Sequence, residues 1–195
     1  RGKDEGMERG HGPAVREMMH HALDRVLSQM DAFSFADLGC GNGWVVRLAA
    51  QHKQCRQADG FDGATHMIEK AKAVDSENGY HLAMFPQTQP SQQYNLIHSM
   101  EFIYYLHDPK QMLQSIHDDW LADEGWAVIG IDHYAENEES LEWPTALDVH
   151  MSTFSEHEWI EMWNDVGFEE VHAWRANQSP GKPGTLAIIG KKNQK

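Results

Sequence analysis

The segment Asp37-Leu38-Gly39-Cys40-Gly41-Asn42-Gly43 follows a short apolar run, Phe33–Leu38, and precedes the run Trp44–Gln51. The first run has the length and composition of a buried strand, and the second has the pattern of a helix. Glycines at alternate positions let the backbone turn tightly and approach a ligand closely. Backbone amides at the start of the following helix favour an anionic group. The segment therefore predicts a ligand-binding turn between a strand and a helix.

A second acidic residue strengthens this interpretation. Asp62 follows Gly43 by nineteen residues and ends the next apolar run, Gln57–Phe61. An α/β nucleotide site places a carboxylate at this position, where it accepts hydrogen bonds from ribose hydroxyls. A tight turn with no ligand is the alternative, but the glycines, their strand–turn–helix context, Asp37 and Asp62 together favour a nucleotide site.

The rest of the chain continues the alternation of strands and helices. Residues 1–12 are polar and glycine-rich, and we expect them to be loose, with a helix starting at Pro13. Ser155 and Glu158 form the pattern of a capping box for a helix that runs to about Val166 and ends at Gly167. The other expected helices are Ala64–Val74 and Pro109–Leu121, and the other expected strands are Tyr80–Phe85, Tyr94–His98, Trp126–Asp132, Val171–Trp174 and Thr185–Ile189.

This order predicts an α/β fold with a doubly wound, Rossmann-like sheet of seven strands. The sheet is expected to be mostly parallel, with the last two strands forming an antiparallel hairpin at one edge, because no helix separates them. We expect a single domain over residues 1–195, with residues 1–30 as an N-terminal segment and helix and residues 133–154 as a lid insertion.

Composition restricts the class of protein. The chain has 195 residues, 41% of them hydrophobic, and a formal charge of −14. A protein surface with this much negative charge repels nucleic acid and anionic lipid, so both are disfavoured as partners. Two cysteines make no disulfide framework, and no apolar run approaches the length of about 20 residues that spans a bilayer. We therefore expect a cytoplasmic protein that binds neither nucleic acid nor membrane, and we expect a monomer or homodimer.

The glycine spacing distinguishes two kinds of cofactor. A dinucleotide fingerprint needs a small residue where this chain has Trp44, so a nicotinamide-dependent oxidoreductase is the less favoured alternative. The observed pattern, acidic-x-G-x-G-x-G, resembles the first motif of the class I S-adenosylmethionine (SAM)-dependent methyltransferases. Similar segments follow in the family's order: Gly60–Ala71, Leu121–Trp126 and Trp159–Val171. The resemblance is closest to the small-molecule enzymes that have little beyond the core fold, and a SAM-binding module without catalysis is a further alternative.

The resemblance implies SAM as cofactor, S-adenosylhomocysteine (SAH) as product, and a set of cofactor-binding positions. It places Gly39, Gly41 and Gly43, with Asn42 between them, beside the methionyl part, Asp37 at the α-amino group and Asp62 at the ribose. The further positions implied are Gly63, Met67, Ala83, Met84, Ser99 and Met100. His11, near the start, is a further candidate contact.

The acceptor site is expected where the fourth and fifth strands end. Glu101 is the candidate for contacting an acceptor amine or hydroxyl, and His133 is the candidate base. A base matters most for a phenol or a carbon acid. No metal is expected. The candidate residues for the wall of the acceptor site are Tyr104, Tyr105, Tyr134, Trp143 and His150.

Overall fold

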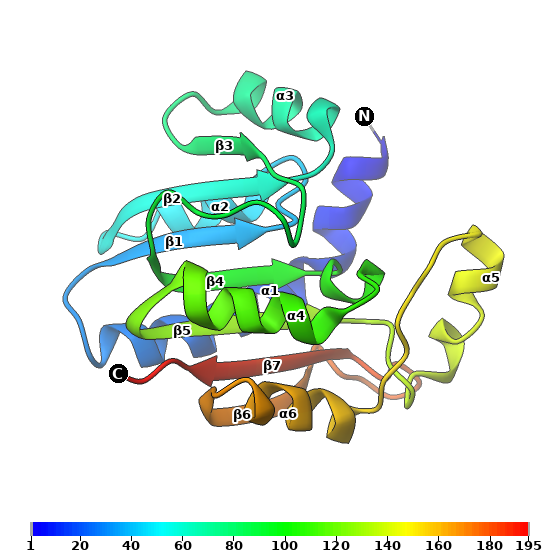
Figure 1. The fold of residues 1–195 in the computed structure, drawn as a ribbon. Helices are drawn as coiled ribbons and strands as arrows, with labels where there is room; N and C mark the ends of the chain where they lie inside the picture. Colours follow the sequence, from blue (N-terminus) through cyan, green and yellow to red (C-terminus); the bar gives the residue numbers. More distant parts are fainter. Residues whose placement is uncertain (1, 195) are drawn as a thin grey trace.

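The glycine-rich segment lies at the end of the third strand from one edge of a seven-stranded sheet (Figure 1). The computed structural model describes residues 2–194, with the side chains of residues 8–194. Residues 1 and 195, the ends of the expected domain, lie outside the described residues. The strands are β1 Phe33–Leu38, β2 Cys55–Asp62, β3 Gly79–Leu82, β4 Tyr94–Met100, β5 Leu121–Ile131, β6 Glu169–Ala176 and β7 Thr185–Lys191.

Helices connect most of these strands. They are α1 Gly2–Leu27, α2 Trp44–Ala50, α3 Thr65–Val74, α4 Pro109–Ser115, α5 Trp143–Leu147 and α6 Glu156–Asp165. Shorter helical segments are the 3-10 turns η1 Ile103–Tyr105 and η3 Glu138–Ser140 and the π-helical η2 Ile116–Trp120.

The strand order is β3-β2-β1-β4-β5-β7-β6. The first five strands of this order pair in parallel, whereas β7 pairs antiparallel with both β5 and β6. The predicted doubly wound α/β fold with a C-terminal antiparallel hairpin is therefore confirmed. The order reverses between β1 and β4, and ligands of such sheets bind outside the carboxyl ends of the strands at this point.

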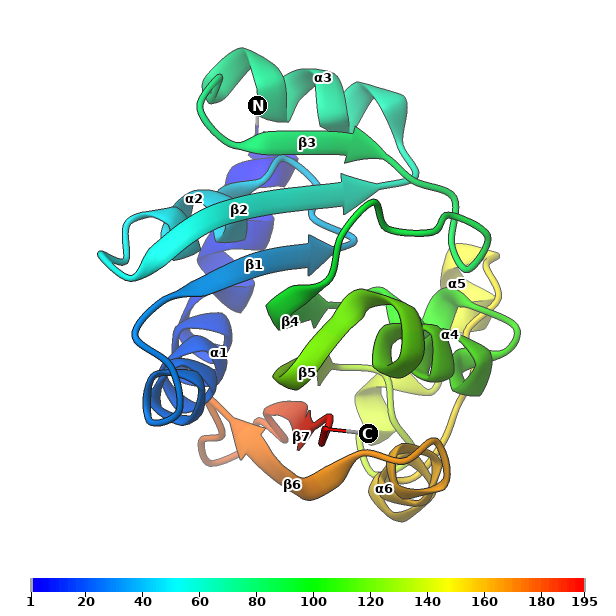
Figure 2. The same cartoon turned by 60° about the vertical axis from the view of Figure 1, so that its left-hand side comes forward.

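Apolar side chains cover both faces of the sheet, which explains the continuous apolar runs in the central strands. Along β5, Trp126 and Val128 belong to the core under α1, α2 and α3, while Ala127 and Ile129 belong to the core under α4 and α6. Figure 2 shows these two helix layers on opposite sides of the sheet. The two cores fix β1 and β4 side by side, and thereby the residues at their ends.

The first helix begins earlier than expected. It runs from Gly2 through Pro13, so the expectation that residues 1–12 are loose is wrong for the described residues. Proline at an interior position removes one bond from the helical ladder, and the sequence therefore favoured a start at Pro13. The helix continues across Pro13 and packs on the sheet from Ala14 and Val15 onward. This extension carries His11 to the end of the sheet.

Most other element bounds differ from the prediction by a few residues. The expected helix over 109–121 becomes α4 followed by the π-helical η2, and β5 starts at Leu121 with an irregular register beside β4. The capping box is confirmed: the Ser155 hydroxyl accepts from the Glu158 backbone N–H, and the Glu158 carboxylate accepts from the Ser155 N–H. Gly167 follows α6 with a φ of 102°, as a helix-ending glycine does.

The segment 133–154 leaves the end of β5 and returns before α6. It contains η3 and α5, and Figure 1 shows α5 standing away from the sheet. Backbone hydrogen bonds close its base, from Ala135 N to Phe154 O (2.9 Å) and from Ser152 N to Tyr104 O (2.7 Å). Among residues 2–194, no helix has the length and apolar character that crossing a membrane requires.

Candidate functional site

The glycine loop is held against the neighbouring strand by its own backbone. The N–H groups of Gly39 and Cys40 both donate to the Phe61 carbonyl at the end of β2, at 2.8 and 3.0 Å. Gly39 has a φ of 80° and Gly43 a φ of 77°, in the left-handed region that glycine tolerates best. A Cβ on Gly39 would lie 2.8 Å from the Cβ of Phe102, and one on Gly43 would lie 2.3 Å from Tyr80 Cε1. Glycine is therefore required at both positions by conformation and by space.

Asp62 joins the loop to the next helix. Its Oδ2 accepts the Gly41 N–H at 2.9 Å, and its Oδ1 accepts the Ala64 N–H at 2.8 Å, just before α3. Each carboxylate oxygen has a second lone pair, so both can accept a further hydrogen bond from a ligand. Asn42 shapes the start of α2 in a similar way, because its side-chain oxygen accepts the Trp44 N–H at 3.2 Å.

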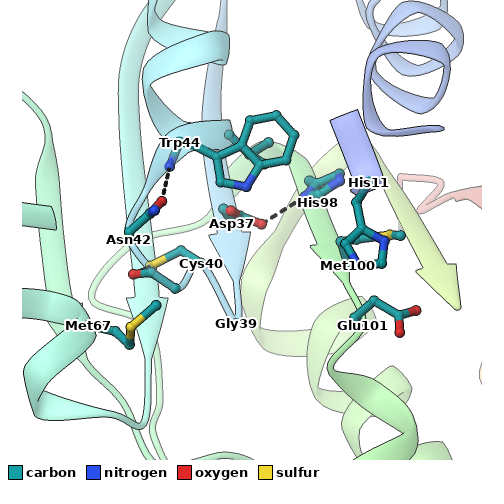
Figure 3. A pocket seen from close by; sticks show the side chains of 12 residues that line it. His11, Asp37, Gly39, Cys40, Asn42, Trp44, Met67, His98, Met100 and Glu101 are labelled. Atoms are coloured by element: carbon teal, nitrogen blue, oxygen red, sulfur yellow. Dashed lines mark hydrogen bonds and ion pairs between the residues drawn. The ribbon is translucent and has the colours of Figure 1, made fainter. Parts of the chain in front are cut away.

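A cavity opens at the carboxyl ends of β1 and β4, beside the glycine loop (Figure 3). We call it the cofactor cavity. Its wall consists of His11, Asp37, Gly39, Cys40, Gly41, Asn42, Trp44, Val45, Met67, His98, Met100 and Glu101. The wall holds carboxyl groups and histidines but neither lysine nor arginine, so it suits a ligand that carries positive charge.

Eight of the residues expected at the cofactor or acceptor site meet in this wall: His11, Asp37, Gly39, Gly41, Asn42, Met67, Met100 and Glu101. The other expected cofactor residues lie outside it. Gly43 packs on Tyr80, and the buried Ser99 hydroxyl donates to the Leu38 carbonyl at 2.7 Å. Gly63 adjoins the buried Ala83 and the 62% exposed Met84, so these three form a surface next to Asp62.

Sequence reasoning missed His98. Asp37 and His98 are register partners on β1 and β4, and Asp37 Oδ1 lies 2.7 Å from His98 Nδ1. Both side chains are buried, and His98 Nε2 is a buried nitrogen with no hydrogen-bond partner among the described residues. A histidine at the end of a predicted strand was the available signal, but its partner depends on the pairing of two strands far apart in sequence.

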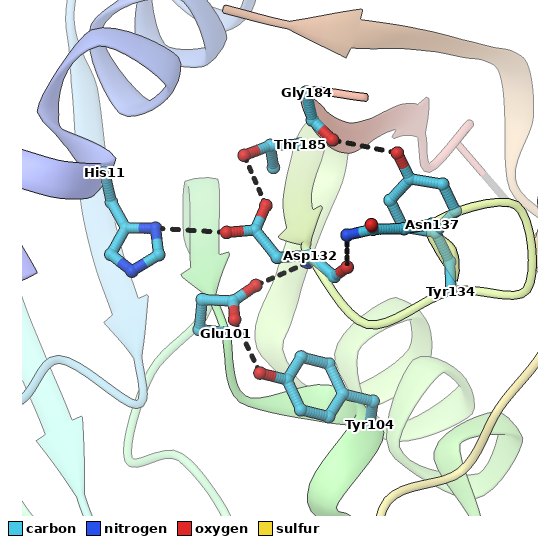
Figure 4. A network of polar contacts seen from close by, with 8 residues as sticks. All are labelled: His11, Glu101, Tyr104, Asp132, Tyr134, Asn137, Gly184 and Thr185. Carbon is cyan, nitrogen blue, oxygen red and sulfur yellow. Dashed lines mark hydrogen bonds and ion pairs between the residues drawn. The ribbon is translucent and has the colours of Figure 1, made fainter. Parts of the chain in front are cut away.

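A second group of polar side chains connects β4, β5 and α1 (Figure 4). Glu101 Oε2 accepts from the Tyr104 hydroxyl, and Glu101 Oε1 accepts from the Asp132 backbone N–H, both at 2.5 Å. Asp132 Oδ2 lies 3.3 Å from His11 Nδ1, and Asp132 Oδ1 accepts from the Thr185 hydroxyl at 2.6 Å. Two carboxyl groups and a histidine thus lie together at one rim of the cofactor cavity.

Burial and charge shift the proton affinities of this group. Burial, reinforced by the charge of Asp132, raises the pKa of Glu101 to about 8, although the Tyr104 hydrogen bond opposes the shift. The hydrogen bond to Asp132 raises the pKa of His11, and burial opposes it. Glu101 therefore exchanges its proton near neutral pH, where a general base is most effective.

A second, more open cavity lies on the far side of His11 and Asp132. We call it the outer cavity. Its wall includes those two residues and is completed by Gly10, Ala14, Asn137, Glu139, Trp143, Ala176, Asn177, Lys182, Pro183, Gly184 and Thr185. It lies between the first helix, the end of β5, the segment 133–154 and the turn between β6 and β7. Among the residues expected to contact the acceptor, Trp143 is placed here.

The structure gives His133 a different position from the one expected of a base. Its Nδ1 lies 3.0 Å from the Ser140 carbonyl oxygen, and its Nε2 lies 2.7 Å from the Thr153 hydroxyl. The side chain is buried and belongs to neither cavity wall, and burial lowers its pKa. Both ring nitrogens are engaged inside the segment 133–154, so this arrangement leaves neither nitrogen free toward the cavities and does not favour the expected role as a base.

The remaining acceptor candidates also differ in their surroundings. Tyr134 is buried outside both cavity walls. Its hydroxyl donates to the Gly184 carbonyl at 2.9 Å, and the Arg175 guanidinium lies 4.3 Å from the centre of its ring. Tyr104 is buried against Glu101, and the exposed Tyr105 packs on its ring. His150 is exposed and lies outside both cavity walls, and its ring is tilted against the His107 ring with the two centroids 4.0 Å apart.

Burial and the nearby carboxylates raise the pKa of the Cys40 thiol in the cofactor cavity, which disfavours the thiolate form that acts as a nucleophile. Within the part of the chain that the structure describes, no three His, Cys, Asp or Glu side chains are grouped so as to hold a metal ion.

Comparison with known proteins adds to this geometry. A family model described as a methyltransferase domain matches residues 15–173, which include the glycine loop and both strand ends at the cofactor cavity. No curated protein sequence matches the chain.

Solved structures share the fold. The partner protein in a complex with the Haloferax volcanii Trm112 methyltransferase activator is 23% identical, covers 99% of this chain and 94% of its own, and has a TM-score of 0.77. A SAM-dependent methyltransferase from Mesorhizobium loti is 19% identical, with coverage of 90% and 98% and a TM-score of 0.70. The N-methyltransferase NodS from Bradyrhizobium japonicum, solved with SAH, is 18% identical, with coverage of 93% and 89% and a TM-score of 0.69. With its glycine loop, its sheet order and the matched domain, this chain belongs to the class I SAM-dependent methyltransferase family.

Proposed function

We propose that this methyltransferase methylates a small acceptor that reaches the cofactor from the outer cavity. The observation that carries the proposal is the contact between the two cavities, whose walls share His11 and meet along Asp132 and Glu101. An acceptor in the outer cavity thus lies next to the carboxyl groups at the rim of the cofactor cavity. A nicotinamide-dependent oxidoreductase is no longer an alternative, because the chain is a methyltransferase.

The residues of the cofactor cavity fit SAM. Gly39 and Gly41 of the glycine loop border the cavity, and the wall lacks the lysine or arginine that would repel a sulfonium and an ammonium group. SAM, when bound, supplies a methyl group that is already electrophilic. We propose that the glycine loop and Asp37 hold the methionyl part, that Asp62 holds the ribose, and that Gly63, Ala83 and Met84 border the adenine.

The protein's own contribution is then to position the acceptor and to remove its proton. Holding a nucleophile in line with the methyl group contributes about 7–11 kcal/mol to lowering the barrier. We propose that Glu101 accepts the proton of an acceptor amine or hydroxyl, while the Tyr104 hydroxyl and the Asp132 N–H keep its carboxylate in place. Asp132, Glu139 and Glu101 also favour a neutral or cationic acceptor over a polyanion.

Partners and location remain proposals of the same kind. The charge of −14 supports an acceptor other than nucleic acid, and we propose a cytoplasmic protein that is a monomer or homodimer. One structural neighbour was solved with the Trm112 activator, so the state of this chain is best measured directly. Size-exclusion chromatography with light scattering measures the molar mass of the purified protein. This mass shows whether the protein is a monomer, a dimer or an aggregate that forms when a partner is missing.

The function is tested by methyl transfer itself. The protein is incubated with SAM carrying a labelled methyl group and with panels of small amines, phenols and carboxylates, and SAH release is measured. We expect turnover with an amine or a hydroxyl compound, and none with inorganic or organic polyphosphates. Tight SAH binding with turnover only on RNA, DNA or protein would contradict the small-acceptor proposal, while the absence of SAH binding would contradict the cofactor site.

A further inference from the structure

The buried pair of Asp37 and His98 has a hydrogen-bonding capacity that the fold leaves unused. Asp37 Oδ1 lies 2.7 Å from His98 Nδ1, and the two side chains are 2% and 0% exposed. A carboxylate only accepts hydrogen bonds, so Nδ1 carries the proton that it donates to Asp37. In a neutral imidazole the other nitrogen, Nε2, is then an acceptor.

This acceptor has no partner within the described chain, although His98 is one of the residues that line the cofactor cavity. Buried polar atoms are nearly always hydrogen-bonded, and a buried exception calls for a ligand or a water. The Asp37 carboxylate is also buried, and no lysine or arginine of the cavity wall balances its charge. The missing partner is therefore expected to be a donor and a cation.

Of the groups in SAM and SAH that donate hydrogen bonds, the α-ammonium alone is charged. The ribose hydroxyls are assigned to Asp62, which lies on β2 on the other side of β1. We propose that His98 Nε2 accepts a hydrogen bond from the α-ammonium group of the cofactor, and that Asp37 is a positioning residue that fixes the required imidazole tautomer. This inference rests on the proposed placement of the cofactor.

The proposal is tested by the affinities of three probes for wild-type protein and a His98→Leu variant, measured by calorimetry. SAH carries both the ammonium and the carboxylate, its decarboxylated analogue keeps only the ammonium, and 5′-methylthioadenosine lacks both. We expect His98→Leu to weaken the binding of SAH and of the decarboxylated analogue at least tenfold, which is the effect of losing a hydrogen bond to a charged group. The affinity for 5′-methylthioadenosine should stay within twofold of the wild-type value.

The matched control is His117→Leu, which removes another buried histidine, on η2, far from the cavity wall in the fold. It should change none of the three affinities. Equal weakening of 5′-methylthioadenosine by His98→Leu would show a structural role and overturn the proposal. A decarboxylated analogue that is insensitive to His98 would point to the carboxylate instead and would also overturn it.

The variant Asp37→Asn tests whether Asp37 fixes the imidazole tautomer of His98. Its amide group donates to Nδ1, which moves the imidazole proton to Nε2 and turns the acceptor into a donor. We expect the variant to lose SAH affinity as His98→Leu does, and the double variant to be no weaker than His98→Leu alone. Additive losses would overturn the positioning role.

Histidine nitrogen NMR on the unmodified protein provides a measurement that needs no variant to fold. We expect a protonated Nδ1 and an unprotonated Nε2 for His98, with the Nε2 signal moving when SAH is added but not with 5′-methylthioadenosine. A protonated Nε2 in the free protein would overturn the assignment. If the wild-type protein binds 5′-methylthioadenosine and SAH, and its SAH affinity does not depend on His98, this inference alone fails. If the wild-type protein binds neither compound, the proposed cofactor site fails as well.

Discussion

The carboxyl group of Glu101 at the end of β4 accepts a hydrogen bond from the backbone N–H of Asp132 at the end of β5, at 2.5 Å. Glu101 has a φ of 55°, in the left-handed region that costs a residue with a side chain about 1–3 kcal/mol. A strained glutamate whose carboxyl group lies in the cofactor cavity, with a pKa raised to about 8, is better suited to proton transfer than to stabilising the fold.

Glu101→Gln should lower kcat by about a hundredfold or more, which is the contribution of a positioned general base. In the wild-type protein, kcat should rise as pH increases toward about 8 and then level off, because the deprotonated carboxylate is the active form. The variant should lose this rise while it keeps its affinity for SAH. A pH profile that is the same in both proteins would contradict the role as a base.

The same residue should make folding stability depend on pH. The pKa of Glu101 is raised from 4.5 to about 8, so the folded protein holds a proton that the unfolded chain releases in this window. Its contribution to stability is fully present below pH 4.5 and is lost as pH rises through about 8, with a slope of up to about 1.4 kcal/mol per pH unit. Urea unfolding of wild type and Glu101→Gln between pH 5 and 9 should show a shallower decline in the variant. Parallel curves would show that the pKa of Glu101 is not raised in the folded protein.

Asp62→Ala should weaken SAH binding by about 1.5–3 kcal/mol, the range for a hydrogen bond to a charged group. The variant also removes the acceptor for the Gly41 and Ala64 N–H groups, so the melting temperature should fall as well. Asp62→Asn keeps one acceptor oxygen and should lose less on both measures. If calorimetry shows unchanged affinity in Asp62→Ala, the ribose role is refuted.

The glycine loop offers a stability test with a control in the same chain. Gly43→Ala places a Cβ 2.3 Å from Tyr80 Cε1 at a φ of 77°, so we expect a loss of about 2 kcal/mol or more in unfolding free energy. Gly10→Ala lies inside α1 with nothing within 4 Å of the new Cβ, and it should be neutral or stabilising by up to about 1 kcal/mol. Equal effects in chemical denaturation would contradict this account of the loop.

Local patterns in the sequence predicted much of this structure. The glycine spacing, the acidic residue at Asp62 and the capping box at Ser155 each act within a few residues or across one βα unit. The strand–turn–helix at the glycines and the capping box are confirmed, whereas the ribose role of Asp62 stays a prediction. The alternation of strand and helix patterns also predicted the doubly wound sheet and its terminal hairpin. It did not predict the order β3-β2-β1-β4-β5-β7-β6, which the structure shows.

What the sequence did not predict depends on contacts between distant segments. The pairing of Asp37 with His98 follows from the register of β1 against β4, which no local pattern specifies. His133 resembled a base because it follows a strand, but the return of the segment 133–154 brings the Thr153 hydroxyl to its ring. The helix across Pro13 likewise depends on packing against the sheet, which outweighs the local preference of proline.

The outer cavity is tested through Trp143, which presents the largest side chain in its wall. Trp143→Ala removes a large apolar surface on which an acceptor can pack, so we expect the KM for the acceptor to rise about tenfold or more. The Kd for SAH should stay within twofold, because Trp143 is absent from the cofactor cavity wall. Leu147→Ala is the matched control: it lies on the same helix α5, is 60% exposed and belongs to neither wall, so it should change neither constant. If both variants raise the acceptor KM equally, the effect comes from loosening α5 in general. If Trp143→Ala raises the Kd for SAH, the two cavities are not the separate sites proposed here.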